Sequence, residues 1–279
     1  MFINEYELIE KLDENNFSQT FKVSKKGDKG YFIMDKLKKR DNDIPKLEKI
    51  LKESISTIKD INHPNIIKMI DFKEDSDYYY YCIYDYCNGG NLSDYIKYLK
   101  ENNKSFSEEE AQYIMKQLIE AFKYFHNKGI IHNDIKTSNI LIYYDSEEDL
   151  VKKNILKAKI KLAGFYVSSP LEKGKFLDTL VGTFGYMSPE IICGNLYNEK
   201  TDIWNLGIIF CKLLSCKTNF HGYNIENYKQ IPFFQNISKE ANSFINSTLQ
   251  FDPKKRINAD ELLKHEFLTK DAKTFSFQK

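Results

Sequence analysis

The stretch Ile131-His132-Asn133-Asp134-Ile135-Lys136-Thr137-Ser138-Asn139-Ile140-Leu141 decides the fold of this chain. It brings a carboxylate, an amine and an amide close together at Asp134, Lys136 and Asn139. The apolar residues before and after it are typical of short buried strands that bracket a polar loop. We therefore expect a loop with acid–base chemistry between two strands.

The composition excludes several classes of function. The chain has 279 residues and a formal net charge of +1, so no excess charge favours binding to nucleic acid or to an anionic membrane. Five cysteines without a Cys-x-x-Cys spacing favour a reducing compartment, and we expect a cytoplasmic protein without a zinc site. The N-terminus lacks a signal-peptide pattern, and the longest apolar run, Leu206 to Leu214, is too short to span a membrane.

The first third of the chain has the character of a small sheet with one helix. Tyr6 to Val23 is typical of a hairpin and Gly30 to Leu37 of a third strand. Ile44 to Ile61 carries apolar residues at helical spacing. We expect a small β-rich N-lobe at about residues 6–87.

The pattern turns helical after Gly89-Gly90. Two capping boxes, which begin at Ser107 and Asn258, each predict the start of a helix. The whole is therefore expected to be one α+β domain over residues 1–279, with two lobes, the larger and mainly helical C-lobe covering about 88–270.

From Tyr6 to about Phe267 the chain resembles a eukaryotic protein kinase domain of the Ser/Thr branch. The opening stretch matches that family's catalytic loop, H-R-D-x-K-x-x-N, with Asn133 in place of the arginine. Three further matches follow in chain order: Gly182–Glu190 (the end of the activation segment), Asp202–Gly207 (a buried helix whose Asp anchors the catalytic loop) and Arg256 (the partner of Glu190). The resemblance implies a bilobal protein-kinase-like fold.

The resemblance also implies catalytic positions. In the family the Asp meets the substrate hydroxyl, the Lys touches the γ-phosphate and the Asn holds a metal ion. These roles fall on Asp134, Lys136 and Asn139, and Thr183 is the matching activation-segment residue.

The nucleotide side departs from the family pattern. Kinases cover the ATP phosphates with G-x-G-x-x-G, because only glycine lets the backbone approach that closely. The matching stretch, Asp13–Ser18, has no glycine and two added carboxylates, which would repel phosphates. We expect the phosphate cradle to be lost.

Three charged positions of the family are replaced as well. The preferred strand register puts Met34 at the phosphate-binding Lys position, and a slip of two residues would put Lys36 there and bury Asp35 at a cost. Ser54 stands in place of the helix Glu, and Gly164 in place of the metal-binding Asp. Asn139 alone is a poor Mg²⁺ site, so no metal site is expected.

The remaining pocket positions are bulky or altered. Phe32 falls where a small residue usually lies over the adenine, and Tyr84 is a bulky residue just before the hinge. With Lys36 they predict a degenerate ATP pocket, whose other lining residues are Asp85, Cys87 and Leu141.

We therefore expect a pseudokinase, a kinase fold that serves as a binding or allosteric module for a protein partner, with no cofactor. The alternative is an active or weakly active Ser/Thr kinase that uses Lys36, ATP and Mg²⁺ on protein substrates. Between the two lies a pseudoenzyme that binds nucleotide without transferring phosphate. The sequence names neither the partner nor the substrate.

Overall fold

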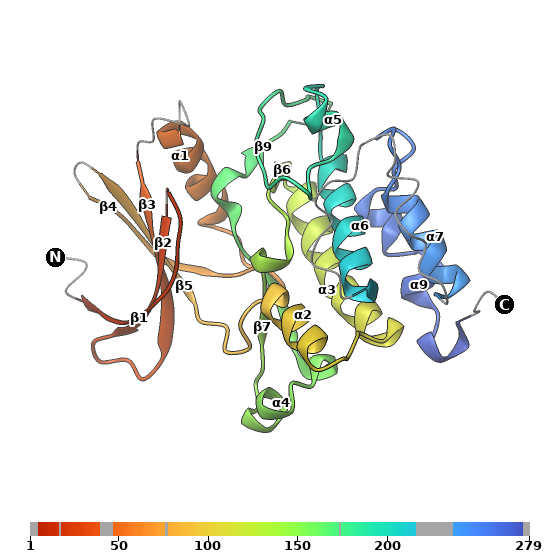
Figure 1. Cartoon of the computed structure of the whole chain (residues 1–279). Helices are drawn as coiled ribbons and strands as arrows, with labels where there is room; N and C mark the ends of the chain where they lie inside the picture. The colour runs from red at the N-terminus through yellow and green to blue at the C-terminus, as the bar shows by residue number, and fades with distance from the viewer. Residues whose placement is uncertain are drawn as a thin grey trace.

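The computed structural model describes residues 5–16, 18–39, 47–75, 78–172, 174–215 and 237–275. They form two lobes, a sheet with one helix and a larger, mainly helical body, which lie side by side in Figure 1. The α+β bilobal architecture expected from the sequence is confirmed.

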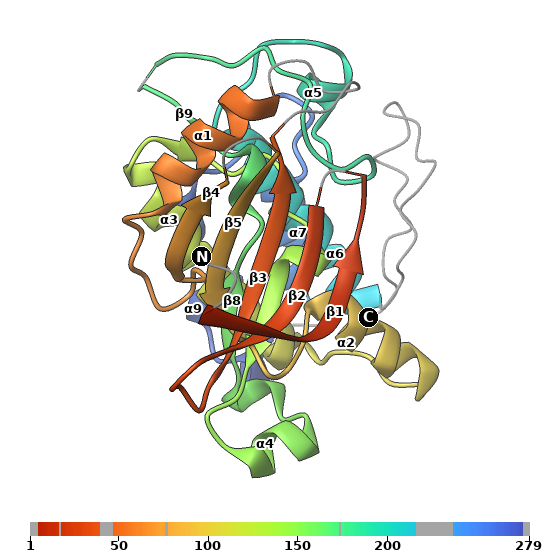
Figure 2. The same cartoon turned by 90° about the vertical axis from the view of Figure 1, so that its left-hand side faces the viewer.

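The N-lobe is built on a five-stranded antiparallel sheet with the order β1-β2-β3-β5-β4, seen face-on in Figure 2. Helix α1 packs against one face of it through Leu51 and Ile55, which share a buried cluster with Leu37 and Tyr80 of the sheet. Residues 44–46 of the helix expected over Ile44 to Ile61 lie outside the described residues. The bounds are β1 Tyr6–Glu14, β2 Ser18–Lys25, β3 Tyr31–Lys38, α1 Leu47–Ile58, β4 Met69–Glu74 and β5 Tyr79–Asp85.

The C-lobe contains helices and short strand pairs. Strands β6 and β9 pair with each other, as do β7 and β8. The bounds of the first half are α2 Leu92–Glu101, α3 Glu108–Asn127, β6 Ile130–Ile131, β7 Ile140–Tyr143, α4 Glu147–Lys152 and β8 Lys159–Leu162. Those of the second half are β9 Ser169–Pro170, α5 Pro189–Ile192, α6 Lys200–Ser215, α7 Lys239–Thr248, α8 Ala259–Leu262 and α9 Glu266–Thr269.

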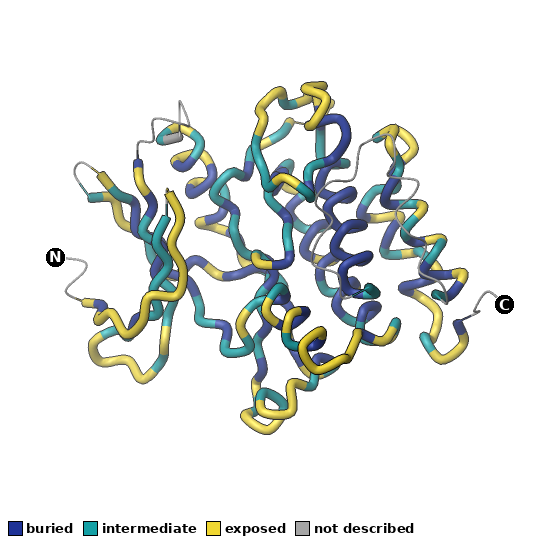
Figure 3. Tube along the Cα trace, viewed as in Figure 1, coloured by how far each residue is buried: buried dark blue, intermediate teal, exposed yellow. Residues whose placement is uncertain are grey.

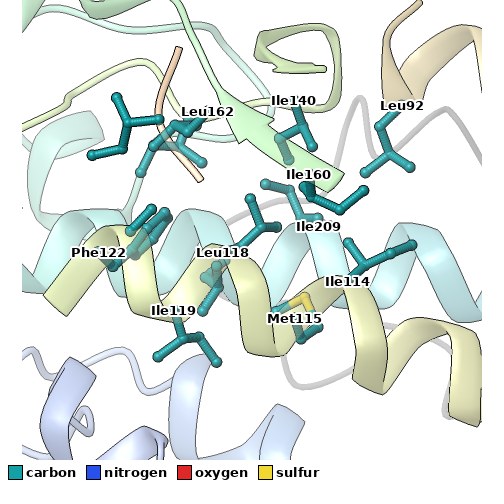
Figure 4. Close-up of a cluster of buried hydrophobic side chains, with 14 of the residues drawn as sticks. Leu92, Ile114, Met115, Leu118, Ile119, Phe122, Ile140, Ile160, Leu162 and Ile209 are labelled. Atoms are coloured by element: carbon teal, nitrogen blue, oxygen red, sulfur yellow. The ribbon is translucent and has the colours of Figure 1, made fainter. Parts of the chain in front are cut away.

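Two helices, α3 and α6, form the centre of the C-lobe. Helix α3 begins at the predicted capping box, in which the Ser107 hydroxyl accepts the Glu110 N–H and the Glu110 carboxylate accepts the Ser107 N–H. Every residue of α6 from Thr201 to Leu213 is buried, and Figure 3 shows this helix largely in the buried colour. Figure 4 shows side chains of α3, including Leu118 and Phe122, together with Ile160 of β8 and Ile209 of α6. This core supports the loops that carry the candidate site.

The segment between β7 and β8 contains helix α4. It is joined to the crossing between the lobes, because Asn88 donates to the Tyr144 carbonyl (2.9 Å) and accepts the Tyr144 N–H (2.8 Å). Within the described ranges, no helix is both long and apolar enough to cross a membrane.

Candidate active site

The loop between β6 and β7 brings three of the predicted side chains together. One carboxylate oxygen of Asp134 accepts the Thr183 hydroxyl at 2.5 Å, and the other lies 2.8 Å from the Lys136 ammonium. Lys136 also donates to the Thr183 hydroxyl oxygen at 2.8 Å. Asp134, Lys136 and Thr183 therefore form one hydrogen-bonded triangle, although Thr183 is distant in sequence.

Asn139 closes the same loop. Its amide nitrogen donates to the Asp134 carbonyl at 2.7 Å and to the Asp134 carboxylate at 3.2 Å. Its side chain also lies directly against Gly164, where an added Cβ would be 2.4 Å from the Asn139 Cγ and Nδ2 atoms. Gly164 has φ +82°, which L side chains rarely adopt, so two independent features favour glycine here.

A buried carboxylate of α6 anchors the loop from behind. Asp202 accepts the backbone N–H groups of His132 (3.0 Å) and Asn133 (3.1 Å), and its carboxylate lies 2.9 Å from His126 Nε2. Asn133 has φ +68° and donates from its side chain to the Val167 carbonyl at 2.9 Å. Asn is one of the few non-glycine residues that tolerate this conformation.

The predicted pair of Glu190 and Arg256 is confirmed. It is bidentate, with nitrogen–oxygen distances of 2.7 and 3.0 Å, and both side chains are buried. Planar, bidentate geometry makes such pairs strong and specific.

The register of β3 decides what faces α1. Ile33, Asp35 and Leu37 lie opposite Tyr84, Cys82 and Tyr80 of β5. Residues directly opposite in a sheet project from the same face, and Leu37, Tyr80, Cys82 and Tyr84 belong to the cluster that includes α1. Asp35 therefore projects toward α1, while the alternate residues of β3 project away from it.

The Asp35 carboxylate is enclosed on this face. It is 5% exposed and accepts the Thr20 hydroxyl of β2 at 2.5 Å. The Tyr166 hydroxyl also donates to it. Burial raises the pKa of Asp35, and the two hydroxyl donors offset only part of that rise.

Ser54 of α1 is fully buried against the segment that follows β8. Its hydroxyl lies 3.0 Å from the Tyr166 carbonyl and 2.9 Å from the Ser168 carbonyl, so one proton is shared between two acceptors. Phe165 of the same segment is buried beside His132, with ring centroids 4.3 Å apart, and Ile58 and Met69 are buried in the same cluster.

The profile described as protein kinase domain matches residues 6–268, nearly the whole chain. The chain belongs to the protein kinase family.

Individual kinases show similarity over different shares of their length. The chain is 30% identical to a probable myosin light chain kinase of Dictyostelium discoideum, covering 98% of this chain and 86% of that protein. It is 31% identical to calcium-dependent protein kinase 4 of Plasmodium berghei and 33% identical to calcium-dependent protein kinase 3 of the same organism, covering 96% and 86% of this chain. The chain spans only 50% and 42% of the length of those two proteins.

Family membership identifies which β3 residue matters. The kinase Lys pairs with a Glu of the N-lobe helix, so it must project toward α1. In this chain Asp35 projects there, and neither Met34 nor Lys36 does. The structure differs from both registers expected from the sequence, and it puts an acid where the kinase has a base.

The other β3 candidates lie on the far face of the sheet. Met34 is buried there with Val23 and Ile83, Phe32 packs against the same cluster with its ring 6.3 Å from Tyr6, and the Lys36 ammonium lies 3.9 Å from the centre of the Tyr79 ring. The expectation that Phe32 fills the adenine space therefore disagrees with the structure. Phe32 and Ile33 are neighbours in β3, so their side chains project from opposite faces of the sheet, and that of Phe32 lies on the face away from α1.

The remaining predicted pocket residues lie around the crossing between the lobes. Tyr84 and Cys87 are buried, and burial raises the pKa of the Cys87 thiol to about 12. Asp85 and Leu141 are half-buried. Lys22, which the sequence reasoning passed over, projects from β2 on the α1 side, opposite Ile33, and its ammonium lies 4.1 and 4.7 Å from the centres of the Tyr31 and Tyr86 rings.

The residues present do not fit a Mg²⁺ ion. Magnesium requires near-octahedral oxygen ligands, usually including carboxylates. Gly164 supplies none, and Asn139 directs its amide nitrogen at Asp134. Across the described ranges, no group of three or more His, Cys, Asp or Glu side chains could hold a metal.

Proposed function

We propose that this protein is a pseudokinase, which keeps the kinase fold as a binding module for a protein partner and does not transfer phosphate. The observation that carries the proposal is the Asp35 carboxylate on the α1-facing side of β3, hydrogen-bonded to Tyr166. An ionised carboxylate repels phosphate, and a protonated one offers it no opposite charge. Either form lacks what the kinase Lys supplies.

Two further positions support the same proposal. Kinase catalysis requires both the Lys–Glu ion pair and the Asp-bound metal, because phosphoryl transfer depends on positioning and charge neutralisation. Ser54 contributes a neutral hydroxyl that is already bonded to backbone carbonyls, and Gly164 has no ligand atom. Asp134 then has a substrate-facing position without the groups that would activate a nucleotide.

A second candidate, an active or weakly active Ser/Thr kinase, is favoured by different observations. The triangle of Asp134, Lys136 and Thr183 is geometrically complete, and the relatives bear the names of kinases. Phosphate transfer by this chain would need a positively charged side chain near the nucleotide phosphates. Lys36 lies on the far face of the sheet, so Lys22 is the better candidate among the described residues of β2 and β3.

Radiolabelled ATP distinguishes the two candidates. We expect the wild-type chain to incorporate no more label into itself or into generic Ser/Thr substrates than Asp134→Ala does, with or without Mg²⁺. Incorporation that disappears in Asp134→Ala and in Lys22→Met, but persists in Lys36→Met, would replace the pseudokinase proposal with the second candidate.

The partner and location belong to the same proposal. The balanced charge of the chain, +1 overall, favours a protein partner over nucleic acid or an anionic membrane, and its cysteine usage favours a cytoplasmic location. No nucleotide or metal is part of this function.

A further inference from the structure

The segment Phe165–Ser169, which follows β8, has an unusual number of its backbone carbonyls bonded to side chains. The Tyr166 and Ser168 carbonyls accept the Ser54 hydroxyl, and the Val167 carbonyl accepts the Asn133 side chain. The Phe165 carbonyl accepts the Ser168 hydroxyl at 2.8 Å. Four consecutive carbonyls are therefore bonded to side-chain donors.

The donors come from separate elements. Ser54 is in the middle of α1, and Asn133 is in the loop between β6 and β7. Asn133 also donates to the Ser169 hydroxyl at 3.1 Å. One five-residue segment is thereby joined to the helix of the N-lobe and to the catalytic loop of the C-lobe.

Tyr166 adds a third attachment. Its hydroxyl donates to Asp35 of β3, which in turn accepts the Thr20 hydroxyl of β2. The sheet, α1 and the catalytic loop thus all meet at this segment. We name Ser54, Asn133, Tyr166 and Asp35 the α1 docking cluster.

We propose that the α1 docking cluster holds α1 against the start of the activation segment through the chain's own side chains, without nucleotide, metal or phosphorylation. Every donor and acceptor in the cluster belongs to the chain itself. Removing one partner from a buried hydrogen bond leaves the other unsatisfied, and this loss is costlier than losing an exposed bond. The docked position of α1 is therefore a built-in property of this chain and does not depend on whether it transfers phosphate.

Hydrogen exchange of the full chain tests the proposal. In Ser54→Ala, two buried carbonyls lose their donor, and in Tyr166→Phe, Asp35 loses one. We expect the backbone amides of residues 47–58 to exchange about five- to tenfold faster in each variant, the factor that corresponds to the loss of one buried hydrogen bond.

Tyr113→Phe is the matched control. It removes a tyrosine hydroxyl that donates to the Ala158 carbonyl at 3.0 Å within the C-lobe, so exchange over residues 47–58 should stay at the wild-type rate. Amides of α6, which carries none of these substitutions, monitor the overall fold in every sample and should keep their protection. Wild-type exchange of α1 in both Ser54→Ala and Tyr166→Phe, with α6 protected, would overturn the proposal.

This experiment measures hydrogen exchange and not phosphate transfer. Failure of the α1 docking cluster can therefore be distinguished from failure of the pseudokinase proposal. A chain that transfers phosphate but loosens α1 in these variants contradicts the pseudokinase proposal and leaves the α1 docking cluster standing. A chain that transfers no phosphate and keeps wild-type exchange of α1 in both variants contradicts only the proposal on the α1 docking cluster.

Discussion

Asp35 is a buried acid at a β3 position where the family has a lysine. A carboxyl group that is almost fully enclosed is stable only with hydrogen-bond partners, and here Thr20 and Tyr166 supply them. The preferred register of β3 did not predict this arrangement. Both faces of β3 carry apolar residues, Ile33 and Leu37 on one and Phe32 and Met34 on the other, so alternation alone did not choose between them.

The pH dependence of Asp35→Asn tests its burial. Burial raises the folded-state pKa of Asp35 above its ordinary value, so the folded chain binds this proton more tightly than the unfolded chain does. Its contribution to the free energy of unfolding is therefore largest below about pH 3.9 and falls as pH rises through the folded pKa. Asparagine at this position has nearly the same shape as aspartate but does not titrate.

We expect the stability of Asp35→Asn relative to wild type to increase as pH rises above about 4, by about 1.4 kcal/mol for each unit by which the pKa is raised. Urea unfolding across pH 4.5 to 8 measures this difference. Asn102→Ala, which removes an exposed side chain that donates to the Tyr98 carbonyl and changes no ionisable group, is the control and should give a nearly constant difference. A constant difference for Asp35→Asn as well would contradict the buried, titrating carboxyl.

Gly164→Asp, which restores the family residue, is expected to destabilise the chain. The new Cβ would lie 2.4 Å from Asn139, at a backbone φ of +82°. Gly174 has a similar φ of +80° but nothing within 4 Å of its added Cβ, so Gly174→Asp separates the backbone strain from the collision.

Strain of this kind costs on the order of 1–3 kcal/mol, and the collision should make the loss for Gly164→Asp larger than that for Gly174→Asp. The midpoint of denaturant unfolding compares them. Equal losses would mean that Asn139 moves aside freely.

At the scale of elements, the sequence motifs predicted the structure better than the strand patterns did. The loop from Ile131 to Leu141 carries its polar side chains and its apolar flanks within one short stretch, so the motif is recognisable in the sequence even though Asp202 and Thr183 contact it from much later in the chain. The position of α1 depends on Ser54 and on carbonyls more than a hundred residues later. Such pairings leave no local signal in the sequence.

The Glu190–Arg256 pair joins α5 to the loop before α8, and its loss should be severe. Breaking one side of a buried ion pair leaves an uncompensated charge and typically costs about 3–5 kcal/mol. Glu190→Gln should lower the free energy of unfolding by this order in chemical denaturation.

Glu101→Gln supplies the comparison for that variant. It removes an exposed pair on α2, in which Glu101 lies 4.0 Å from Lys97, and such helix pairs contribute about 0.3–0.5 kcal/mol. A loss for Glu190→Gln as small as that for Glu101→Gln would show that Arg256 finds other acceptors, such as the Lys200 and Gln250 carbonyls it already contacts.

For the whole molecule, hydrophobic patterning and motif order together predicted the two lobes, because both are repeated over many residues. A nucleotide site of the kinase kind would depend on single side chains from both lobes, and at these positions the expectations for Phe32 and Lys36 differed from the structure. A wrong expectation at one position leaves the predicted fold unchanged, whereas it changes which side chains are expected to line a site.

We expect Mg²⁺ not to change the effect of ATP on the melting temperature of this chain. The reason is the absence of a fitting ligand set around Asn139 and Gly164 within the described ranges. We expect the melting temperature in excess ATP to be the same in Mg²⁺ as in EDTA, after correction for the salt effect seen without ATP. A ligand at about 100 times its dissociation constant adds about 2.7 kcal/mol, so Mg²⁺-dependent binding would appear as a shift of several degrees and would contradict this prediction.

Under the proposed function, the contact between Asp35 and Tyr166 also limits the paths by which kinase activity could arise in this chain. Asp35→Lys alone would bury an ammonium group beside a tyrosine hydroxyl and remove the acceptor that Tyr166 uses. Tyr166 stands where the family's D-F-G sequence has its glycine. Tyr166→Gly alone would remove a packed ring and leave the Asp35 carboxylate short of one donor. Each single step therefore passes through a less stable protein. A directed-evolution experiment that selects for activity would have to introduce both substitutions at once, or begin from a variant stabilised elsewhere.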